Sequence, residues 1–202
     1  MTTIIGQTPP RKALEDLLGS AARVAVLAAL VTDPTRAYYQ RQLEAATGQP
    51  IRAVQRELER LMGAGLLYRR VEGRRVYYQV DREAALYREL RALVLAGLGG
   101  VQRLRGRLAV DRAVRLAFLS GGGGRALVVL HEDCAGREAV ALEGIEVETW
   151  TSARFREALQ GRSPGLACFL LEGCDLLGRR DDVVWRHIEA AGYRVRKGDG
   201  VP

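Results

Sequence analysis

The sequence predicts an α+β protein, and three observations lead to that prediction. Helical patterns fill the first third of the 202-residue chain, and two alternating segments rich in Val and Tyr follow them directly. The last third alternates short apolar runs with helical patterns, which indicates a small α/β unit. Residues 1–81 carry 12 basic and 8 acidic side chains, whereas residues 119–202 carry 11 and 13. An anionic partner would therefore meet the first half.

The composition is that of a globular protein, with 48% hydrophobic residues and a formal net charge of +7. All basic residues except Lys12 and Lys197 are arginine, a bias that suits contacts to phosphate and guanine and that a GC-rich genome would also produce. No apolar run reaches the roughly 18 to 20 residues that span a bilayer, and no signal-peptide pattern is present, so we expect a cytoplasmic protein without a membrane partner. Three cysteines without paired spacing predict reduced, mostly buried thiols and no metal site.

Four helices are predicted before residue 65, and turn residues separate them. Residues 1–8 are expected to be a loose tail, and Pro9-Pro10 suits the first turn of a helix that Gly19 ends. Ser20 is a good N-cap for the second helix, which should bury a stripe of apolar residues at helical spacing. This stripe consists of Val24, Leu27, Ala28 and Val31. The third helix is expected at about 38–46 and the fourth at 50–62.

A basic hairpin is predicted behind the fourth helix, whose core face should be Val54, Leu58 and Leu61. Its strands, 66–71 and 75–80, alternate in polarity, and Gly73 in the turn between them can take a positive φ. Arginines flank this turn at positions 69, 70, 74 and 75. They are unsuited to a core, and they suit a phosphate backbone or a minor groove.

Residues 11–81 resemble a winged helix-turn-helix of the broad ArsR and MarR class. The resemblance is carried by LLGSAARVAVLAAL, then RQLEAATG, then AVQRELERLMGAGLLYRRVEGRRVYYQV. It implies that residues 1–81 bind duplex DNA, with helix 50–62 in the major groove and wing 69–75 on the backbone or in the minor groove. The residues implied to face DNA are Gln49, Arg52, Ala53, Gln55 and Arg56 from the helix and Arg69, Arg74 and Arg75 from the wing.

Two further expectations concern this first domain. Arg60 lies a full turn deeper along the helix, so we expect it to pair with Glu57 or Glu59. Metal-sensing members of the class bind metal through clustered Cys, His or Asp. No cysteine precedes Cys134 and no histidine precedes His131, so metal sensing is not expected.

Residues 82–113 are predicted to form linker or dimerisation helices. Asp81 should cap the first of them, whose apolar stripe either packs on the second domain or forms a dimer interface. This stripe consists of Leu86, Leu90, Leu93 and Val94. The second helix, at about 101–113, should bury Leu104 and Leu108. Its arginines at 103, 105, 107 and 112 are expected in solvent, with an extended DNA-facing surface as the alternative.

The second domain, residues 114–202, is predicted to be a small α/β unit. Its strands are expected at 114–120, 126–130 and 144–150, and its helices at 152–159, 165–176 and 183–191, the last capped by Asp181 or Asp182. The glycine loop at 121–125 is interpreted as a flexible turn. A phosphate cradle is the alternative, but a strand rather than a helix follows the loop, and no Lys or Ser/Thr stands at the required place.

Most of residues 82–180 resemble, more loosely, the minimal nucleotidyltransferase domain that many prokaryotic winged-helix proteins carry. The resemblance is carried by LYRELRALV, VRLAFLS, the glycine loop, ALVVL, TSARFREALQG and LLEGCDLLG. The family's two metal-binding aspartates would fall at Gly124 and Ala126, which cannot hold divalent cations. We therefore expect a degenerate domain without catalytic residues, metal or cofactor, and a chain that is not an enzyme.

These features together predict a DNA-binding transcriptional regulator. The expected partners are double-stranded DNA, a second copy in a homodimer, and an unidentified small-molecule or protein effector. A nucleotidyltransferase-type enzyme is one alternative, and it would have to use other carboxylates, such as Glu132 and Asp133. A module for non-specific DNA binding or for protein contacts is the other.

Overall fold

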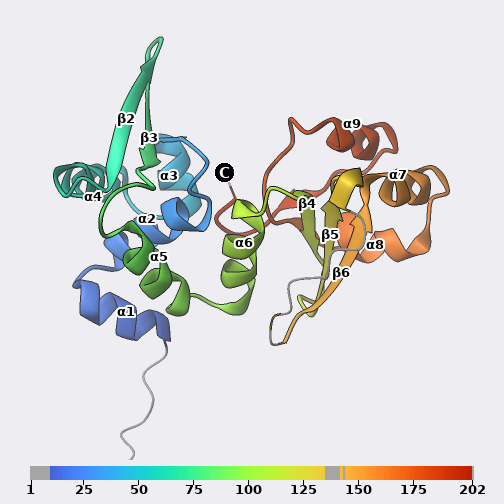
Figure 1. Ribbon diagram of the computed structural model, residues 1–202, viewed down its shortest axis with the longest axis horizontal. Helices are drawn as coiled ribbons and strands as arrows, with labels where there is room; N and C mark the ends of the chain where they lie inside the picture. The colour runs from blue at the N-terminus through green and yellow to red at the C-terminus, as the bar shows by residue number, and fades with distance from the viewer. Residues whose placement is uncertain (1–9, 135–141, 143, 202) are drawn as a thin grey trace, which may run out of the picture. The chain divides into compact units, whose positions relative to one another are not determined.

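The computed structural model describes residues 10–134, 142 and 144–201, and it is a mixed α+β protein, as predicted. The chain divides into two compact units, one that ends at Gly106 and one that begins at Arg107 (Figure 1). The loose tail expected at residues 1–8 lies outside the described residues. Within the described ranges, no helix is long and apolar enough to cross a membrane.

Helix α2 is the centre of the first unit. The helices of this unit are α1 (Pro10–Leu18), α2 (Ala21–Thr32), α3 (Gln40–Thr47), α4 (Ile51–Gly63) and α5 (Tyr87–Ala96). Because α2 packs against all the others, it buries more than the predicted stripe: Val26 and Leu30 are buried as well, while Ala28 is only partly covered. Ser20 caps α2 as predicted, since its hydroxyl accepts a hydrogen bond from the Arg23 amide at 3.2 Å.

A small antiparallel sheet accompanies these helices. Its strands are β1 (Tyr38–Tyr39), β2 (Leu67–Glu72) and β3 (Arg75–Val80), in the order β1-β3-β2. The hairpin of β2 and β3 agrees with the prediction within one residue, and Gly73 has a φ of +58° in its two-residue turn. The prediction that a helix begins near residue 38 was wrong, because Tyr38 and Tyr39 pair with β3 and the helix begins at Gln40.

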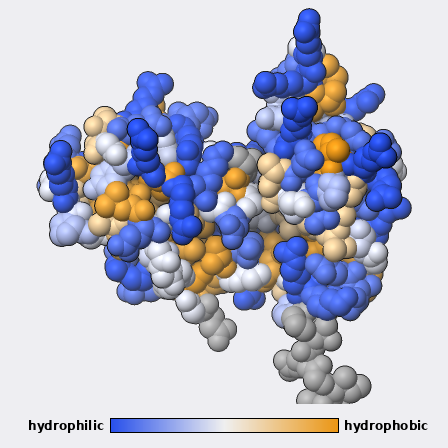
Figure 2. Space-filling view, turned by 180° about the vertical axis from the view of Figure 1, so that it is seen from behind, coloured by the Kyte–Doolittle hydropathy of each residue, from blue (hydrophilic) through white to orange (hydrophobic). Residues whose placement is uncertain are grey.

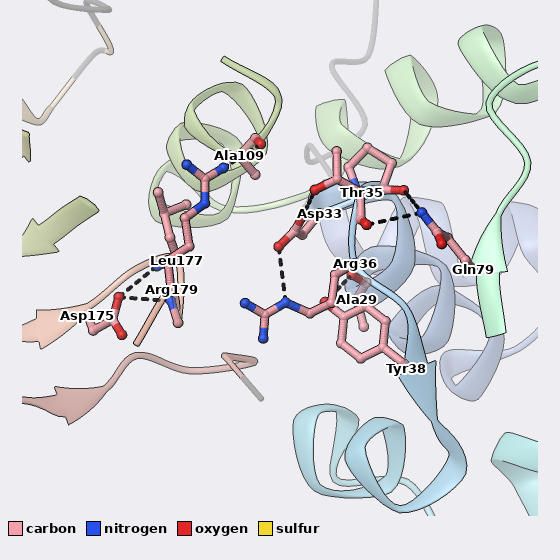
Figure 3. A network of polar contacts seen from close by, with 12 residues as sticks. Ala29, Asp33, Thr35, Arg36, Tyr38, Gln79, Ala109, Asp175, Leu177 and Arg179 are labelled. Atoms are coloured by element: carbon pink, nitrogen blue, oxygen red, sulfur yellow. Dashed lines mark hydrogen bonds and ion pairs between the residues drawn. The ribbon is translucent and has the colours of Figure 1, made fainter. Parts of the chain in front are cut away.

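The loop before β1 is fastened to β3 by polar contacts (Figure 3). Asp33 is only 4% exposed, and its carboxylate accepts from the Thr35 hydroxyl at 2.8 Å and from Arg36 Nε at 3.3 Å. Gln79 on β3 donates from Nε2 to the Thr35 carbonyl oxygen at 3.0 Å. Burial raises the pKa of Tyr38 to about 12, so its hydroxyl stays protonated and donates to the Ala29 carbonyl oxygen. These bonds hold β1 in place although it is only two residues long.

Helix α5 belongs to the first unit, where Tyr87, Val94 and the following Leu98 enter the core. Asp81 does not cap it, contrary to prediction. Its Oδ1 instead accepts from the Glu83 amide at 3.0 Å, and this local turn delays the helix until Tyr87. Of the predicted apolar stripe, Val94 is buried, whereas Leu86 and Leu93 are exposed.

Helix α6 (Gly100–Val110) contains the boundary between the units. It buries Leu104 and Leu108, as predicted. Arg103 and Arg107 are exposed, also as predicted, but Arg105 is only 4% exposed. That expectation was wrong because the Arg105 guanidinium interacts with the buried hydroxyl of Tyr38.

The second unit is built on a mixed sheet covered by helices. Its strands are β4 (Val114–Leu119), β5 (Arg125–Leu130), β6 (Glu146–Thr151), β7 (Cys174–Asp175) and β8 (Arg196–Lys197), in the order β6-β5-β4-β7-β8. Strand β4 is antiparallel to β5 and β7, while β5 and β6 are parallel. Sequence reasoning located β4, β5 and β6. It missed the two-residue strands β7 and β8, which are too short to show any periodicity.

Short helices and an aromatic cluster complete this unit. The helices are α7 (Ser152–Gln160), α8 (Ala167–Leu170) and α9 (Val183–Ala190), with 3₁₀ turns at Glu132–Cys134 and Pro164–Leu166. Phe118 stacks on both Phe155 and Trp185. Asp182 caps α9, as predicted, by accepting from the Val184 amide at 2.8 Å.

The long helix predicted at 165–176 was wrong. It ends at Leu170, because the chain turns at Gly173 to bring β7 beside β4. A Cβ at Gly173 would overlap the carbonyl oxygens of Leu119 and Phe169, so only glycine allows this approach. The prediction of mostly buried thiols was right for Cys174 alone, since Cys134 and Cys168 are half-buried.

The turn of the hairpin yields a test. Alanine adopts the left-handed backbone of Gly73 at a cost of about 1–2 kcal/mol, so Gly73→Ala should destabilise the hairpin by that amount. Gly63→Ala is the matched control, because Gly63 is the last helical residue of α4 and an added Cβ meets nothing within 4 Å. It should stabilise α4 by up to about 1 kcal/mol. Amide hydrogen exchange measures both changes. Unchanged protection of β2 and β3 in Gly73→Ala would contradict the left-handed conformation of Gly73 in the turn.

Candidate functional site

Helix α4 has one face in the core and one in solvent. Val54, Leu58 and Leu61 are buried at the predicted spacing of four and then three residues. Arg52 and Arg56 are exposed on the opposite side, four residues apart and therefore neighbours along the helix. Neither arginine makes an ion pair or a side-chain hydrogen bond with any residue that the structure describes. The helix thus presents two uncompensated guanidinium groups.

The other predicted residues of this helix lie less openly. Ala53 is half-buried beside Arg52. Gln49 precedes the helix, and its backbone N–H donates to the Thr47 hydroxyl at 3.3 Å. Gln55 is also half-buried, and its Nε2 donates to Gln40 Oε1 on α3 at 3.1 Å. Part of the hydrogen-bonding capacity of Gln55 is therefore used inside the fold.

Gln40 joins three elements, and sequence reasoning did not single it out. Its Oε1 accepts from Gln55 on α4, and its Nε2 donates to the Tyr78 hydroxyl on β3 at 3.1 Å. Both ends of one amide side chain are thus engaged. No sequence pattern marks such a role, because it depends on side chains up to 38 residues apart.

A buried carboxylate fixes the inner side of α4. Glu57 is 5% exposed, and its Oε2 accepts from Arg23 Nε on α2 at 2.9 Å. Arg60 pairs with Glu57 Oε1 at 3.3 Å, which selects Glu57 from the two predicted partners. Arg23 also donates to the carbonyl oxygen of Leu18 at the end of α1. One carboxylate and one guanidinium therefore tie α1, α2 and α4 together.

Strands β2 and β3 and their turn, residues 67–80, form what we call the arginine hairpin. It projects from the first unit, and its surface is largely hydrophilic (Figures 1 and 2). Arg69, Arg74 and Arg75 are exposed on it. Arg70 pairs with Glu72 at 2.9 Å, but both side chains are more than half exposed, so this pair adds little stability.

Arg75 is held against aromatic rings. Its guanidinium lies 5.4 Å from the centroid of the Tyr39 ring, and Tyr39 meets Tyr77 edge-on at 6.1 Å. A hydrogen bond with Tyr77 raises the pKa of Arg75 further above its usual value, and arginine is charged at physiological pH in any case. The positive charge at the base of the turn is thus both permanent and oriented.

A hollow of about 470 Å³ lies between the arginine hairpin and the start of α3. We call it the arginine pocket, and its lining consists of Tyr39, Gln40, Arg41, Arg74, Arg75 and Val76. Arg41 was not among the predicted site residues. The only available signal was its place near a helix start. That place does not indicate proximity to the hairpin, because Arg74 lies 33 positions further along the chain. Three guanidinium groups meet here, and no carboxylate is in the lining.

Comparisons of the chain with protein-family models, with curated proteins and with solved structures found no match. The nucleotidyltransferase resemblance would place two aspartates at positions 124 and 126 of the second unit. Position 124 is Gly124, in the loop before β5, and position 126 is Ala126, which is buried within β5. Among the residues that the structure describes, no group of three His, Cys, Asp or Glu side chains could hold a metal ion. The basic surface of the first unit is the candidate site.

The role of Glu57 can be measured with a double-mutant cycle of Arg23→Ala and Glu57→Ala. Arg23→Ala leaves the buried Glu57 with only the exposed Arg60, and Glu57→Ala leaves Arg23 without a counter-ion. We therefore expect a coupling energy of roughly 1–2 kcal/mol in urea unfolding followed by circular dichroism. The exposed Lys12–Asp16 pair on α1 is the control, and it should show much weaker coupling. Equal coupling in the two cycles would show that Glu57 does not anchor α4.

Proposed function

We propose that this chain is a DNA-binding transcriptional regulator of the winged helix-turn-helix type. One observation carries the proposal. Arg52 and Arg56 stand side by side and uncompensated on a helix whose other face is locked into the core. A cationic helix face that cannot turn inward suits an anionic partner, and duplex DNA offers both phosphates and guanine edges to arginine.

The connection between α3 and α4 supports the proposal. Residues 48–50 form a short turn in which Gly48 has a φ of +65°, and a glycine-containing turn of this length joins the helices of a helix-turn-helix. Helix α4 has 13 residues and is therefore about 20 Å long, and a major groove about 12 Å wide accepts one helix. Arg52 and Arg56 would reach base edges or phosphates from its exposed face.

The arginine hairpin would serve as the wing. Its tip carries Arg74 and Arg75 in solvent, and β3 pairs on both sides, with β1 and β2. Paired strands make the hairpin stiffer than a loop, so its charges keep their place when a backbone approaches. Sequence-independent contacts of this kind position a protein on the duplex, while the helix supplies specificity.

For the second unit we propose a role without catalysis, in dimerisation or in binding an effector. Gly124 and Ala126 supply no carboxylates for two-metal phosphoryl transfer. A dimer would present two α4 helices to half-sites about one helical turn apart. We propose the cytoplasm as the place where such a regulator acts.

Selection from a random duplex library tests the function directly. We expect the purified full-length protein to enrich one motif, and a pseudo-palindrome if it acts as a dimer. Enrichment of no motif despite duplex binding would instead favour an architectural DNA binder. No binding to any duplex would overturn the proposal and leave a protein-contact module as the alternative.

Alanine variants separate base reading from backbone contact. Arg52→Ala or Arg56→Ala should weaken binding to the selected duplex by roughly 1–3 kcal/mol more than binding to a scrambled duplex. Arg74→Ala should weaken both and flatten their dependence on salt, because it removes a phosphate contact. Fluorescence anisotropy across a salt series measures these effects. Arg88→Ala, which removes an exposed arginine from α5, is the control. If Arg88→Ala weakens binding as much as Arg52→Ala does, the effect of Arg52 is explained by net charge alone.

A further inference from the structure

We propose that the arginine pocket is a seat for a single backbone phosphodiester of the bound DNA, built jointly by the start of α3 and the arginine hairpin. The inference rests on the proposed function and assigns a separate subsite within it. The sequence resemblance pointed only to α4 and the wing, whereas this seat includes Arg41 from α3. Its three guanidinium groups come from two segments that β1–β3 pairing brings together.

The charge of the pocket favours an anion. Arg41, Arg74 and Arg75 line it, and none of them has an ion-pair partner within the described part of the chain. Glu72, an acidic residue at the same turn, already pairs with Arg70 at 2.9 Å. Three cations that face one hollow repel one another, and a bound phosphate would turn that repulsion into charge-assisted hydrogen bonds.

The walls of the pocket are organised before any ligand binds. Arg75 rests on the Tyr39 ring and contacts Tyr77, so its guanidinium is oriented. Tyr39 is fixed in turn by its pairing with Tyr77 and by its amide, which donates to Gln42 Oε1 at 3.1 Å. Organisation of this kind lowers the entropy cost of binding. Arg41 and Arg74 are exposed on either side of the hollow and would complete the contacts to the anion.

The lining favours a phosphate within a polymer over a free small molecule. A pocket that holds a small ligand is predominantly apolar and covers most of the ligand surface. In the arginine pocket Val76 is the one aliphatic side chain, and the hollow is open to solvent. A volume of about 470 Å³ exceeds that of a phosphate group, and the excess suits the sugars on either side of a phosphodiester.

The pocket is also connected to the face of α4. Gln40 lines the pocket and bonds to Gln55 on α4 and to Tyr78 on β3. Gln55 stands between Arg52 and Arg56 in the sequence of α4. A phosphate seated in the pocket would therefore fix the position of α4 along the groove, which is how phosphate contacts set register without reading bases.

The test combines Arg41→Gln with neutral phosphates. Methylphosphonate is placed singly at each backbone position of the selected duplex, and affinity is measured by anisotropy. Wild type should lose about tenfold in affinity at one position outside the groove contacted by α4, the size expected for one charge-assisted contact. Arg41→Gln should lose its sensitivity at that position alone, and its slope of log K against log salt should fall by about 0.9.

Two comparisons complete the design. Arg88→Gln removes the same charge from an exposed site on α5 and should keep the wild-type methylphosphonate profile. Arg74→Gln should reproduce the effect of Arg41→Gln from the other wall of the pocket. Inorganic phosphate and pyrophosphate, titrated into the DNA-free protein, should bind only weakly.

Each other outcome is decisive. An Arg41→Gln profile identical to wild type, on a duplex that both proteins bind, overturns the phosphate seat and leaves the regulator proposal standing. Saturable binding of free pyrophosphate that Arg41→Gln abolishes, with an unchanged methylphosphonate profile, assigns the pocket to a free anion and also overturns the seat. Failure of wild type to bind any duplex overturns the proposed function and this inference together.

Discussion

The orientation of helix α4 depends on one buried carboxylate. Glu57 is taken out of water, and its desolvation is offset by Arg23 from α2 and Arg60 from its own helix. The ion pair adds a directional constraint to the close-packed apolar contacts of Val54 and Leu58. Together these contacts keep Arg52 and Arg56 on the exposed side of the helix.

Hydrogen bonds connect α4 to the rest of the site. Gln55 on α4 donates to Gln40, Gln40 donates to Tyr78 on β3, and Gln79 on the same strand donates to the loop that leads into β1. Helix α4, strand β3 and the loop before β1 are therefore joined by one series of polar contacts. Charged groups carried by elements joined in this way start from fixed backbone positions, which lowers the ordering cost of binding.

The sequence was sufficient for elements with a clear period and insufficient for contacts that only folding creates. The buried spacing of Val54, Leu58 and Leu61 and the alternation around Gly73 predicted α4 and the hairpin within one residue. Two-residue strands such as Tyr38–Tyr39 carry no period, so β1 was missed. Glu57 or Glu59 was expected to pair with Arg60, but the bond of Glu57 to Arg23 was not predicted, and neither Gln40 nor Arg41 was identified. The partners of Glu57 and Gln40 in these contacts lie 15 to 38 residues away, and Arg41 meets the hairpin arginines only across a pocket, so spacing along the chain does not indicate them.

The outer half of the arginine hairpin touches none of the core. From Tyr68 to Arg75 every residue is exposed, and the segment is constrained mainly by the backbone ladder, by Gly73 and by the contact of Arg75 with Tyr39. Side chains there can change without a cost in packing, whereas Leu67, Tyr78 and Val80 at its base cannot. The molecule therefore separates a mutationally tolerant tip from an intolerant base. Substitutions at the tip would therefore change the surface that meets a partner, while the frame that carries it stays constant.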